Sequence, residues 1–518
     1  MPRVITFLLL VIMTACTASP AVTPSPTPRP AATITPAPQP PLPSDWAGEM
    51  THADGHRESI LLKITETGGT LNFQPQTENL PLAGFERSGA TVSFEAGDLG
   101  ALQFSGSFDG SRITGEVEAN GEAGSFTLLP LAAAANPALD QFFGTYQFDS
   151  GEALLINSAP EYSQAGLYFF GQGLMLTDFG TGAIRRLYPT AEDTFLVGRA
   201  RALGAPFPGQ VIFARDGAGK VIGLSWQSRD PLTGELGEAQ DATRLALASE
   251  VVHFTSEDGT KLTGLLTLPP TPGPYPAIMN LHGSEPGTKD DFGSQQMSAF
   301  MASQGIAVLT YDKRGAGESG GHYSESASGT NLGLTAQDAL SGVAYLKSRP
   351  EIIADRIGLS GFSQAGWVIP LAASQSDDVA YFIVLSGPVT SVGHESLYSS
   401  YTNNGDSPTQ TSQGEIMRRL STAPHSGFDP VPSLAELEQP GLWLWGDQDK
   451  SIPVPESEAN LKGLMDQGRS NFAYAILADA DHNLQQTTQG LFNEIPYSPG
   501  YHPDYYTSLA SWLKEHAK

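Results

Sequence analysis

Residues 44–247 consist of short runs in which apolar and polar residues alternate, separated by turns that contain glycine. A period of two places successive side chains on opposite faces of a strand, so each run predicts a strand with one buried face. Strands at this spacing are typical of an antiparallel barrel or sandwich. An alanine-rich joint at 132–136 divides the region into two β accessory domains, which we place at 44–134 and 137–248. We expect strands at 59–65, 70–73, 90–94, 101–108, 112–117 and 125–129 in the first domain, and at 153–156, 165–170, 194–197, 211–214 and 221–226 in the second.

The pattern changes at about residue 250, where a hairpin at 251–255 and 261–268 opens a third domain, 250–518. Continuous apolar runs then alternate with amphipathic stretches, which predicts an α/β fold with a mostly parallel sheet flanked by helices. About 270 residues suffice for one complete core, so we expect this domain to fold alone. An insertion at 388–439 is interpreted as a cap over the site. The expected strands are 277–281, 306–311, 357–362, 379–385, 442–445 and 472–477, and the expected helices 290–303, 334–347, 364–374, 456–465 and 504–515.

The third of these apolar runs ends on Ser363, and a helical stretch begins directly after it. A nucleophilic serine needs such a turn, because its hydroxyl must project from the carboxyl edge of a sheet beside a helix N-terminus. Gly361 and Gly366 keep the bend free of side chains. A serine in an ordinary strand-to-helix turn has the same local pattern, so the neighbouring strand ends must decide.

Polar groups follow the other parallel strands as well. Asp447 and Asp449 follow the run at 442–445, and His482 follows the run at 472–477. His502 and His516 lie farther on, at the start of the last helix and within it. Because catalytic groups gather at the carboxyl ends of parallel strands, His482 is the expected base. The order Ser, Asp, His is that of one of the three serine hydrolase arrangements.

Residues 250–518 resemble the alpha/beta-hydrolase superfamily, and within it the dienelactone-hydrolase-like and acyl-CoA-thioesterase-like branch of esterases. This resemblance favours Asp449 over Asp447 as the triad acid. Ala365 departs from the usual pattern, which has a second glycine two residues after the serine. The two β domains resemble small accessory domains attached to bacterial hydrolases of this fold. The residues that carry the resemblance are His282-Gly283-Ser284, the segment 312–319 (DKRGAGES), Gly361-Phe362-Ser363-Gln364-Ala365-Gly366, Gly446-Asp447-Gln448-Asp449 and Asp481-His482.

Acyl-transfer chemistry assigns a role to each residue. Ser363 attacks the carbonyl carbon while His482 takes its proton, and Asp449 orients the imidazole. The backbone N–H groups of Gln364 and Ser284 are the expected oxyanion donors. This chemistry needs neither a metal nor an organic cofactor. We therefore expect a serine hydrolase that cleaves small-molecule carboxylic esters or thioesters, with a serine peptidase and a non-catalytic binding lipoprotein as the alternatives.

The N-terminus predicts export. Residues 1–15 have one early basic residue and an apolar core that is shorter than the roughly 20 residues of a spanning helix, as in a signal peptide. Met13-Thr14-Ala15-Cys16 resembles the lipobox of bacterial lipoproteins, which implies lipidation of Cys16, and residues 16–43 form a Pro/Thr/Ser-rich linker. We expect an extracytoplasmic protein of the bacterial cell envelope, lipid-anchored on a membrane; a secreted protein and an uncleaved anchor are the alternatives. The net charge of −27, without a basic cluster, argues against nucleic acid as a partner.

Overall fold

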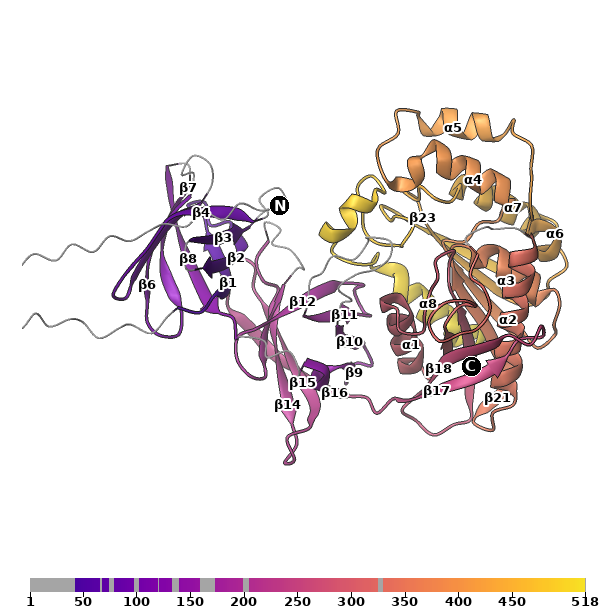
Figure 1. Cartoon of the computed structure of the whole chain (residues 1–518), viewed down its shortest axis with the longest axis horizontal. Coiled ribbons are helices and arrows are strands. Elements are labelled where there is room, and N and C mark those ends of the chain that lie inside the picture. Colours follow the sequence, from indigo (N-terminus) through magenta and orange to yellow (C-terminus); the bar gives the residue numbers. More distant parts are fainter. Residues whose placement is uncertain are drawn as a thin grey trace, which may run out of the picture. The chain divides into compact units, whose positions relative to one another are not determined.

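The computed structural model describes residues 42–65, 68–73, 79–96, 102–119, 121–132, 139–158, 173–198, 205–324 and 329–517. Two closed antiparallel barrels precede an eight-stranded, mostly parallel sheet (Figure 1). This architecture confirms the predicted α/β fold and the two antiparallel β domains before it. The signal peptide, Cys16 and the strand expected at 165–170 lie outside the described residues. Among the described residues, no helix combines the length and the hydropathy that a bilayer span requires.

The first barrel closes because its first strand pairs with its last, Trp46 opposite Pro130. Alternate side chains point inward and fill the interior, where Phe104 stacks on Phe94 and meets Phe126 edge to face. The sequence pattern missed β1 and β4; no residue of β4 is fully buried, and a register shift between Ala83 and Glu86 interrupts its alternation. The strands are β1 (Asp45–Thr51), β2 (Arg57–Thr65), β3 (Gly68–Asn72), β4 (Leu80–Ser88), β5 (Thr91–Ala96), β6 (Leu102–Phe108), β7 (Ile113–Ala119) and β8 (Glu122–Pro130).

The second barrel follows a short 3-10 helix, η1 (Leu139–Phe142), and closes by pairing of its first strand with its last. Phe142, Phe195 and Phe213 pack against one another among its core residues. The last strand, β16, buries only Ala242, which is why its sequence gives no strand signal. The strands are β9 (Gly144–Phe148), β10 (Ala153–Ser158), β11 (Leu174–Asp178), β12 (Ile184–Pro189), β13 (Thr194–Gly198), β14 (Gly209–Arg215), β15 (Val221–Arg229) and β16 (Leu236–Arg244).

The sheet of the C-terminal domain has the order β17-β18-β20-β19-β21-β22-β23-β24. The first two strands form the predicted hairpin, and β20 to β24 run parallel to β19. The inner strands are buried on both faces, as their continuous apolar runs predict. The strands are β17 (Ala248–Thr255), β18 (Lys261–Leu268), β19 (Tyr275–Leu281), β20 (Ala307–Tyr311), β21 (Ile352–Phe362), β22 (Tyr381–Leu385), β23 (Gly441–Gly446) and β24 (Phe472–Leu477).

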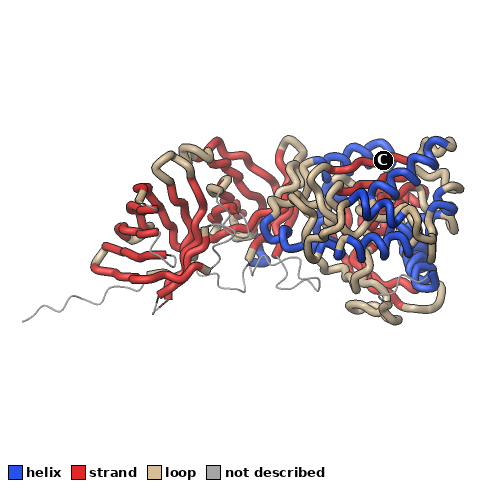
Figure 2. Tube along the Cα trace, turned by 90° about the horizontal axis from the view of Figure 1, so that it is seen from above, coloured by secondary structure: helices blue, strands red, loops and turns tan. Residues whose placement is uncertain are grey.

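Helices cover both faces of this sheet, and Figure 2 shows them around the strands near the C-terminus. Helices α2, α3 and α7 pack in one apolar cluster, and α1 and α8 in another. Between β22 and β23, within the insertion at 388–439, lie α4, η2, α5 and α6; α4 and α5 pack together through Tyr398, Ile416 and Leu420. The helices are α1 (Phe292–Ser303), α2 (Gly329–Lys347), α3 (Ala365–Ala373), α4 (Val392–Tyr401), η2 (Asn403–Gly405), α5 (Gln413–Leu420), α6 (Val431–Leu434), α7 (Val454–Asp466), η3 (Phe492–Tyr497) and α8 (Asp504–His516).

The second barrel shares an apolar cluster with the C-terminal domain. Phe179, after β11, packs edge-on against Phe300 of α1 and contacts Tyr506 of α8. Buried polar groups join the same surfaces, because Gln296 donates to the Thr177 hydroxyl at 2.8 Å and accepts from Tyr501 at 2.6 Å. This shared core argues against the independent folding that the sequence pattern led us to expect for residues 250–518.

Two fragments test the shared core. A fragment beginning at residue 248 exposes the aromatic surface that Phe179 covers, so we expect it to aggregate or to bind a dye specific for exposed apolar surface. A fragment beginning at residue 42 keeps both barrels, including the apolar cluster that Ala47 of the first barrel forms with Tyr188 and Phe207 of the second, and should be soluble and unfold in one cooperative transition. Size-exclusion chromatography and thermal unfolding distinguish them; equal solubility and equal melting temperature of the two fragments would contradict the shared core.

Candidate active site

Ser363 occupies a sharp turn between β21 and α3. Its φ of 52° lies in the left-handed region, which residues with a side chain rarely adopt. Two backbone hydrogen bonds hold the turn: Ser363 N–H donates to Leu385 O at 2.8 Å, and Gly366 N–H donates to Ser363 O at 2.9 Å. A Cβ on Gly361 would overlap the Cβ of Ala365. Ala365 therefore fits in place of the usual glycine because Gly361 leaves it room.

A continuous chain of hydrogen bonds joins the three predicted residues. His482 Nε2 lies 3.1 Å from Ser363 Oγ, and His482 Nδ1 lies 2.8 Å from Asp449 Oδ2. Because the carboxylate accepts the Nδ1 proton, Nε2 carries the lone pair and faces the serine hydroxyl. Asp449 and His482 are only 2% and 8% exposed. The arrangement can move a proton from Ser363 onto His482 as the serine attacks a carbonyl carbon.

The structure decides between the alternative residues for the triad acid and for the triad base. Asp449 Oδ1 accepts the N–H groups of Ser451 and Ile452, which fixes the carboxylate, whereas Asp447 is exposed. His502 accepts the N–H of Asp504, and His516 stacks on Trp512, so neither takes part in the hydrogen-bond chain at Ser363. Of these five candidates, the structure brings Asp449 and His482 to the serine.

The loop of the acid and the loop of the histidine are bonded to each other. Gln448 N–H donates to Ala480 O at 2.9 Å, and Asp447 N–H donates to Leu477 O at 3.0 Å. Gly446 makes the close contact possible, since a Cβ there would overlap Ala480 O. Asp481 accepts the N–H groups of Asn483 and Gln485, which closes the turn that carries His482. These bonds set the distance between Asp449 and His482.

The two expected oxyanion donors lie at the same strand ends. In the described part of the chain, no hydrogen bond uses the backbone N–H of Gln364 or of Ser284. The Ser284 loop comes close to the nucleophile, because a Cβ on Gly283 would lie 3.3 Å from Ser363 Cβ. His282 anchors this loop from below by donating from Nε2 to Tyr311 O at 2.5 Å. Both N–H groups are thus free to receive a developing oxyanion.

The pKa of His482 reflects the carboxylates around it. Burial lowers the pKa of the ring, but the charge of Asp449 and its hydrogen bond, with further contributions from Asp481 and Glu395, raise it above its ordinary value. Burial also raises the pKa of Asp481 to about 6 and that of Glu395 to about 7. His482 is therefore a stronger base than an isolated histidine.

Glu395, a partly buried residue of α4, is a further charged group beside the triad, and its role was not predicted from the sequence. It lies one helical turn before Tyr398, whose hydroxyl donates to Asp449 O at 2.9 Å, so both face the triad side of the helix. In the described part of the chain, the one hydrogen bond that its carboxylate accepts comes from the Ser396 hydroxyl at 3.2 Å. In the sequence, only its position within the insertion at 388–439, which we interpret as a cap, places it near the site.

Replacing Glu395 by glutamine should shift the acid limb of the kcat/KM profile to lower pH. The negative charge of Glu395 raises the pKa of His482, and catalysis needs neutral His482, so removing the charge lets the base lose its proton at lower pH. A pH profile on a small ester measures the shift. Glu415→Gln, on α5, where the carboxylate pairs with Arg418 and Arg419, is the matched control and should leave the limb in place; an identical limb in Glu395→Gln and the wild type would contradict the assignment.

One group of possible metal ligands occurs among the described residues: His394, His425 and Glu456, with ligand atoms within 4.8 Å of one another. His394 uses both ring nitrogens, at 2.8 Å from Glu456 Oε1 and at 3.1 Å from Ala423 O. The rings of His394 and His425 stack at 3.7 Å and 20°. Nearly parallel rings direct their lone pairs alongside each other rather than at one ion. The group fastens α4 to α7.

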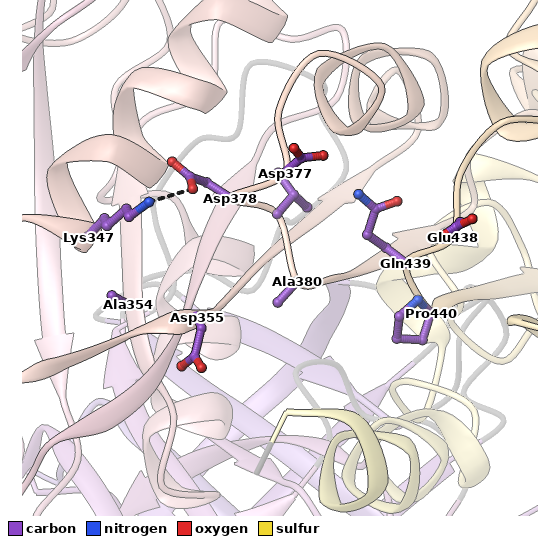
Figure 3. A pocket seen from close by; sticks show the side chains of 10 residues that line it. Lys347, Ala354, Asp355, Asp377, Asp378, Ala380, Glu438, Gln439 and Pro440 are labelled. Atoms are coloured by element: carbon purple, nitrogen blue, oxygen red, sulfur yellow. Dashed lines mark hydrogen bonds and ion pairs between the residues drawn. The ribbon is translucent and has the colours of Figure 1, made fainter.

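Two hollows lie on the C-terminal domain. One, of about 490 Å³, lies at the amino ends of β21, β22 and β23, the edge opposite Ser363 (Figure 3). Its lining carries four carboxylates, and Lys347 pairs with one of them, Asp378. The other, of about 290 Å³, adjoins the acid loop through Gln448 and Lys450. Catalytic groups gather at the carboxyl ends of parallel strands, so the hollow of about 290 Å³ is the one relevant to the site.

Comparison with known proteins agrees with this geometry. Residues 292–518 match the model of the prolyl oligopeptidase family. The chain is 26% identical over 330 residues to Esterase EstD of Thermotoga maritima, covering 58% of this chain and 74% of that protein. It is 26% identical over 300 residues to human acyl-coenzyme A thioesterase 1, covering 54% and 65%. It is 24% identical over 278 residues to dipeptidyl-peptidase 5 of Porphyromonas gingivalis, covering 52% and 38%.

Among solved structures, the esterase Pf2001 of Pyrococcus furiosus is similar, with 19% identity, a TM-score of 0.39, and coverage of 53% of this chain and 94% of that one. Three findings agree on the nature of the C-terminal domain: the strand order of its sheet, the sharp turn at Ser363 and the match to the prolyl oligopeptidase family model. The chain carries an alpha/beta-hydrolase domain with the site of a serine hydrolase, behind two eight-stranded antiparallel barrels.

Proposed function

We propose that this protein cleaves carboxylic esters or thioesters through an acyl-enzyme on Ser363. The observation that carries the proposal is the unbroken hydrogen-bond chain from Ser363 Oγ through His482 to Asp449 at the carboxyl ends of three strands. Ser363 Oγ attacks the carbonyl carbon, and His482 takes its proton. His482 then gives that proton to the leaving alcohol or thiol, and water completes the cycle in the second half-reaction. Gln364 and Ser284 N–H stabilise the oxyanion.

The names of two relatives support the proposed preference for alcohol and thiol leaving groups. EstD is an esterase, and acyl-coenzyme A thioesterase 1 is a thioesterase. An alcohol or thiol also leaves more easily than an amine, which must be protonated as the bond breaks. Substrates of this class are small molecules with an acyl group.

A serine peptidase is the second candidate, because residues 292–518 match the prolyl oligopeptidase family and one relative is named a dipeptidyl peptidase. The same triad cleaves amides when the substrate is held well enough to direct the amine leaving group to His482. The third reading, a binding lipoprotein with an inactive hydrolase domain, conflicts with the assembled triad.

A substrate panel distinguishes the candidates. Purified full-length protein is assayed on acyl esters, acyl thioesters and aminoacyl amides that share one acyl group, with kcat/KM as the readout. The proposal predicts ester or thioester kcat/KM values at least about 100-fold above those for amides. Because esters are intrinsically more reactive than amides, amide kcat/KM values within about 100-fold of the ester values favour the peptidase, and no turnover of any of the three by folded protein favours the binding lipoprotein.

We further propose that the protein is held at the bacterial cell envelope by a lipid on Cys16. The support is the sequence Met13-Thr14-Ala15-Cys16 and the proline-rich segment that follows it. Cys16→Ser should move the protein from the detergent phase to the aqueous phase, or leave it unprocessed, because Cys16 is the chain's one thiol. Phase partitioning and intact mass measure this; unchanged partitioning of Cys16→Ser would favour an uncleaved anchor, and aqueous partitioning of the wild type a secreted protein.

A further inference from the structure

Lys313, in the loop after β20, is a buried lysine that pairs with no carboxylate among the described residues. It is 2% exposed, and its Nζ donates to Gly283 O at 2.6 Å, to Gln364 Oε1 at 2.9 Å and to Glu285 O at 3.4 Å. By contrast, two other buried cations near Lys313 form ion pairs: Lys289 with Asp312 and Arg314 with Asp338. A buried charge without an ion pair is costly, so its hydrogen bonds must serve a purpose.

The residues on either side hold Lys313 in place. Asp312 accepts the Lys289 and Glu318 N–H groups at 2.8 Å, and Arg314 forms a bidentate pair with Asp338. Lys313 N–H donates to Gly287 O at 2.9 Å. The backbone of the loop is therefore fixed, and the Lys313 side chain reaches the site from a rigid base.

The acceptors of Lys313 belong to the two oxyanion donors. Gly283 O is part of the same peptide group as Ser284 N–H, and in a trans peptide the carbonyl and the N–H point in opposite directions. Fixing Gly283 O on the ammonium therefore directs Ser284 N–H away from Lys313. Gln364 contributes the other donor from its backbone, while its side chain accepts from Lys313. A hydrogen bond to a peptide carbonyl also polarises the N–H of that peptide.

We propose that Lys313 is the positioning residue of the oxyanion hole: its ammonium joins Gly283 O to the Gln364 side chain and thereby orients and polarises Ser284 N–H toward the oxyanion. Lys313 does not touch the substrate; it acts through the two donors. The inference rests on the proposed function, because it concerns the transition state of that reaction.

The charge of Lys313 supplies a pH readout. Burial lowers its pKa to about 8 against the opposing charge of Glu285, so the ammonium loses its proton within the working range of an esterase. The positioning effect is present below this pH and lost above it. Wild-type kcat/KM should therefore fall above pH 8, whereas Lys313→Arg, which stays protonated, should hold its activity there.

The test compares Lys313→Met and Lys313→Arg with Lys289→Met, which removes a buried lysine of the same region that does not contact Gly283 or Gln364. We expect Lys313→Met to lower kcat by about 10- to 100-fold with KM within about threefold. Affinity for a trifluoromethyl ketone, which forms an oxyanion on the serine, should fall by a factor similar to that of kcat/KM. Lys289→Met should lose stability but keep that affinity.

Three outcomes would overturn the inference: Lys313→Met with wild-type kcat and ketone affinity, an equal loss of ketone affinity in Lys289→Met, or wild-type ketone affinity that stays constant from pH 7 to 10. The last needs no variant, so it holds even where Lys313→Met fails to fold. Failure of the proposed function is a different result, namely wild-type protein that cleaves no ester or thioester.

Discussion

Replacing Ser363 by alanine should remove nearly all ester turnover and leave the fold unchanged. The change deletes one oxygen atom and keeps the Cβ, so the strained turn at φ 52° and its two backbone hydrogen bonds persist. Loss of the nucleophile in an assembled triad typically costs on the order of 10⁴ or more in kcat. Initial rates on an activated ester and thermal unfolding, measured on the same preparation, give both quantities.

The matched control is Ser360→Ala. Ser360 lies three residues earlier in β21 and is fully buried, with its hydroxyl bonded to Asn280 at 2.7 Å. This variant loses stability through an unpaired Asn280 acceptor but keeps the nucleophile. Activity of folded Ser363→Ala that equals the wild type would move the chemistry to another residue.

Asp449→Asn should reduce turnover far more than Asp447→Asn. Only the Asp449 carboxylate accepts from His482 Nδ1, and an amide in its place can donate to that nitrogen and stabilise the wrong tautomer. The expected loss of kcat is on the order of 10³ to 10⁴ for Asp449→Asn. Asp447 is exposed, and its replacement should leave kcat within about twofold.

The kcat values of the two variants on one ester make the comparison. Because the substitutions are two residues apart in the same loop, disturbance of the loop affects both. A larger loss in Asp447→Asn would reverse the assignment of the acid.

Much of this architecture is readable from periodicity. The period-two alternation gave most strands of the barrels, and the continuous apolar runs gave the six parallel strands, because burial on both faces leaves room for few polar positions. Two of the strands that escaped, β4 and β16, bury almost nothing, whereas two others, β1 and β11, are largely buried. Their positions depend on pairing with neighbours, which sequence alternation does not record.

The residues of the site also differ in how far the sequence predicts them. Ser363 and His482 followed from their places at strand ends, whereas the choice between Asp447 and Asp449 needed a family resemblance. Glu395 had no such signal, and Lys313, although it lies at a strand end within the segment 312–319, was assigned no role from the sequence. A charged residue in a sequence is usually a solvated one, and only the fold shows that these two face the triad and the oxyanion loop.

The contact of the second barrel with α1 and α8 was also beyond the sequence. Phe179 and Tyr506 are aromatic residues like many others in the chain, and nothing local marks them as neighbours. The contact arises from long-range packing, and it is the reason why we expect a fragment beginning at residue 248 to expose apolar surface.

The most direct test of the account is covalent labelling of the full-length protein with a fluorophosphonate, followed by peptide mass spectrometry to locate the adduct. The account predicts one modified residue, Ser363, with labelling abolished in Ser363→Ala and slowed by at least about 100-fold in His482→Ala. An adduct on another serine, or no adduct on folded wild-type protein, would contradict it.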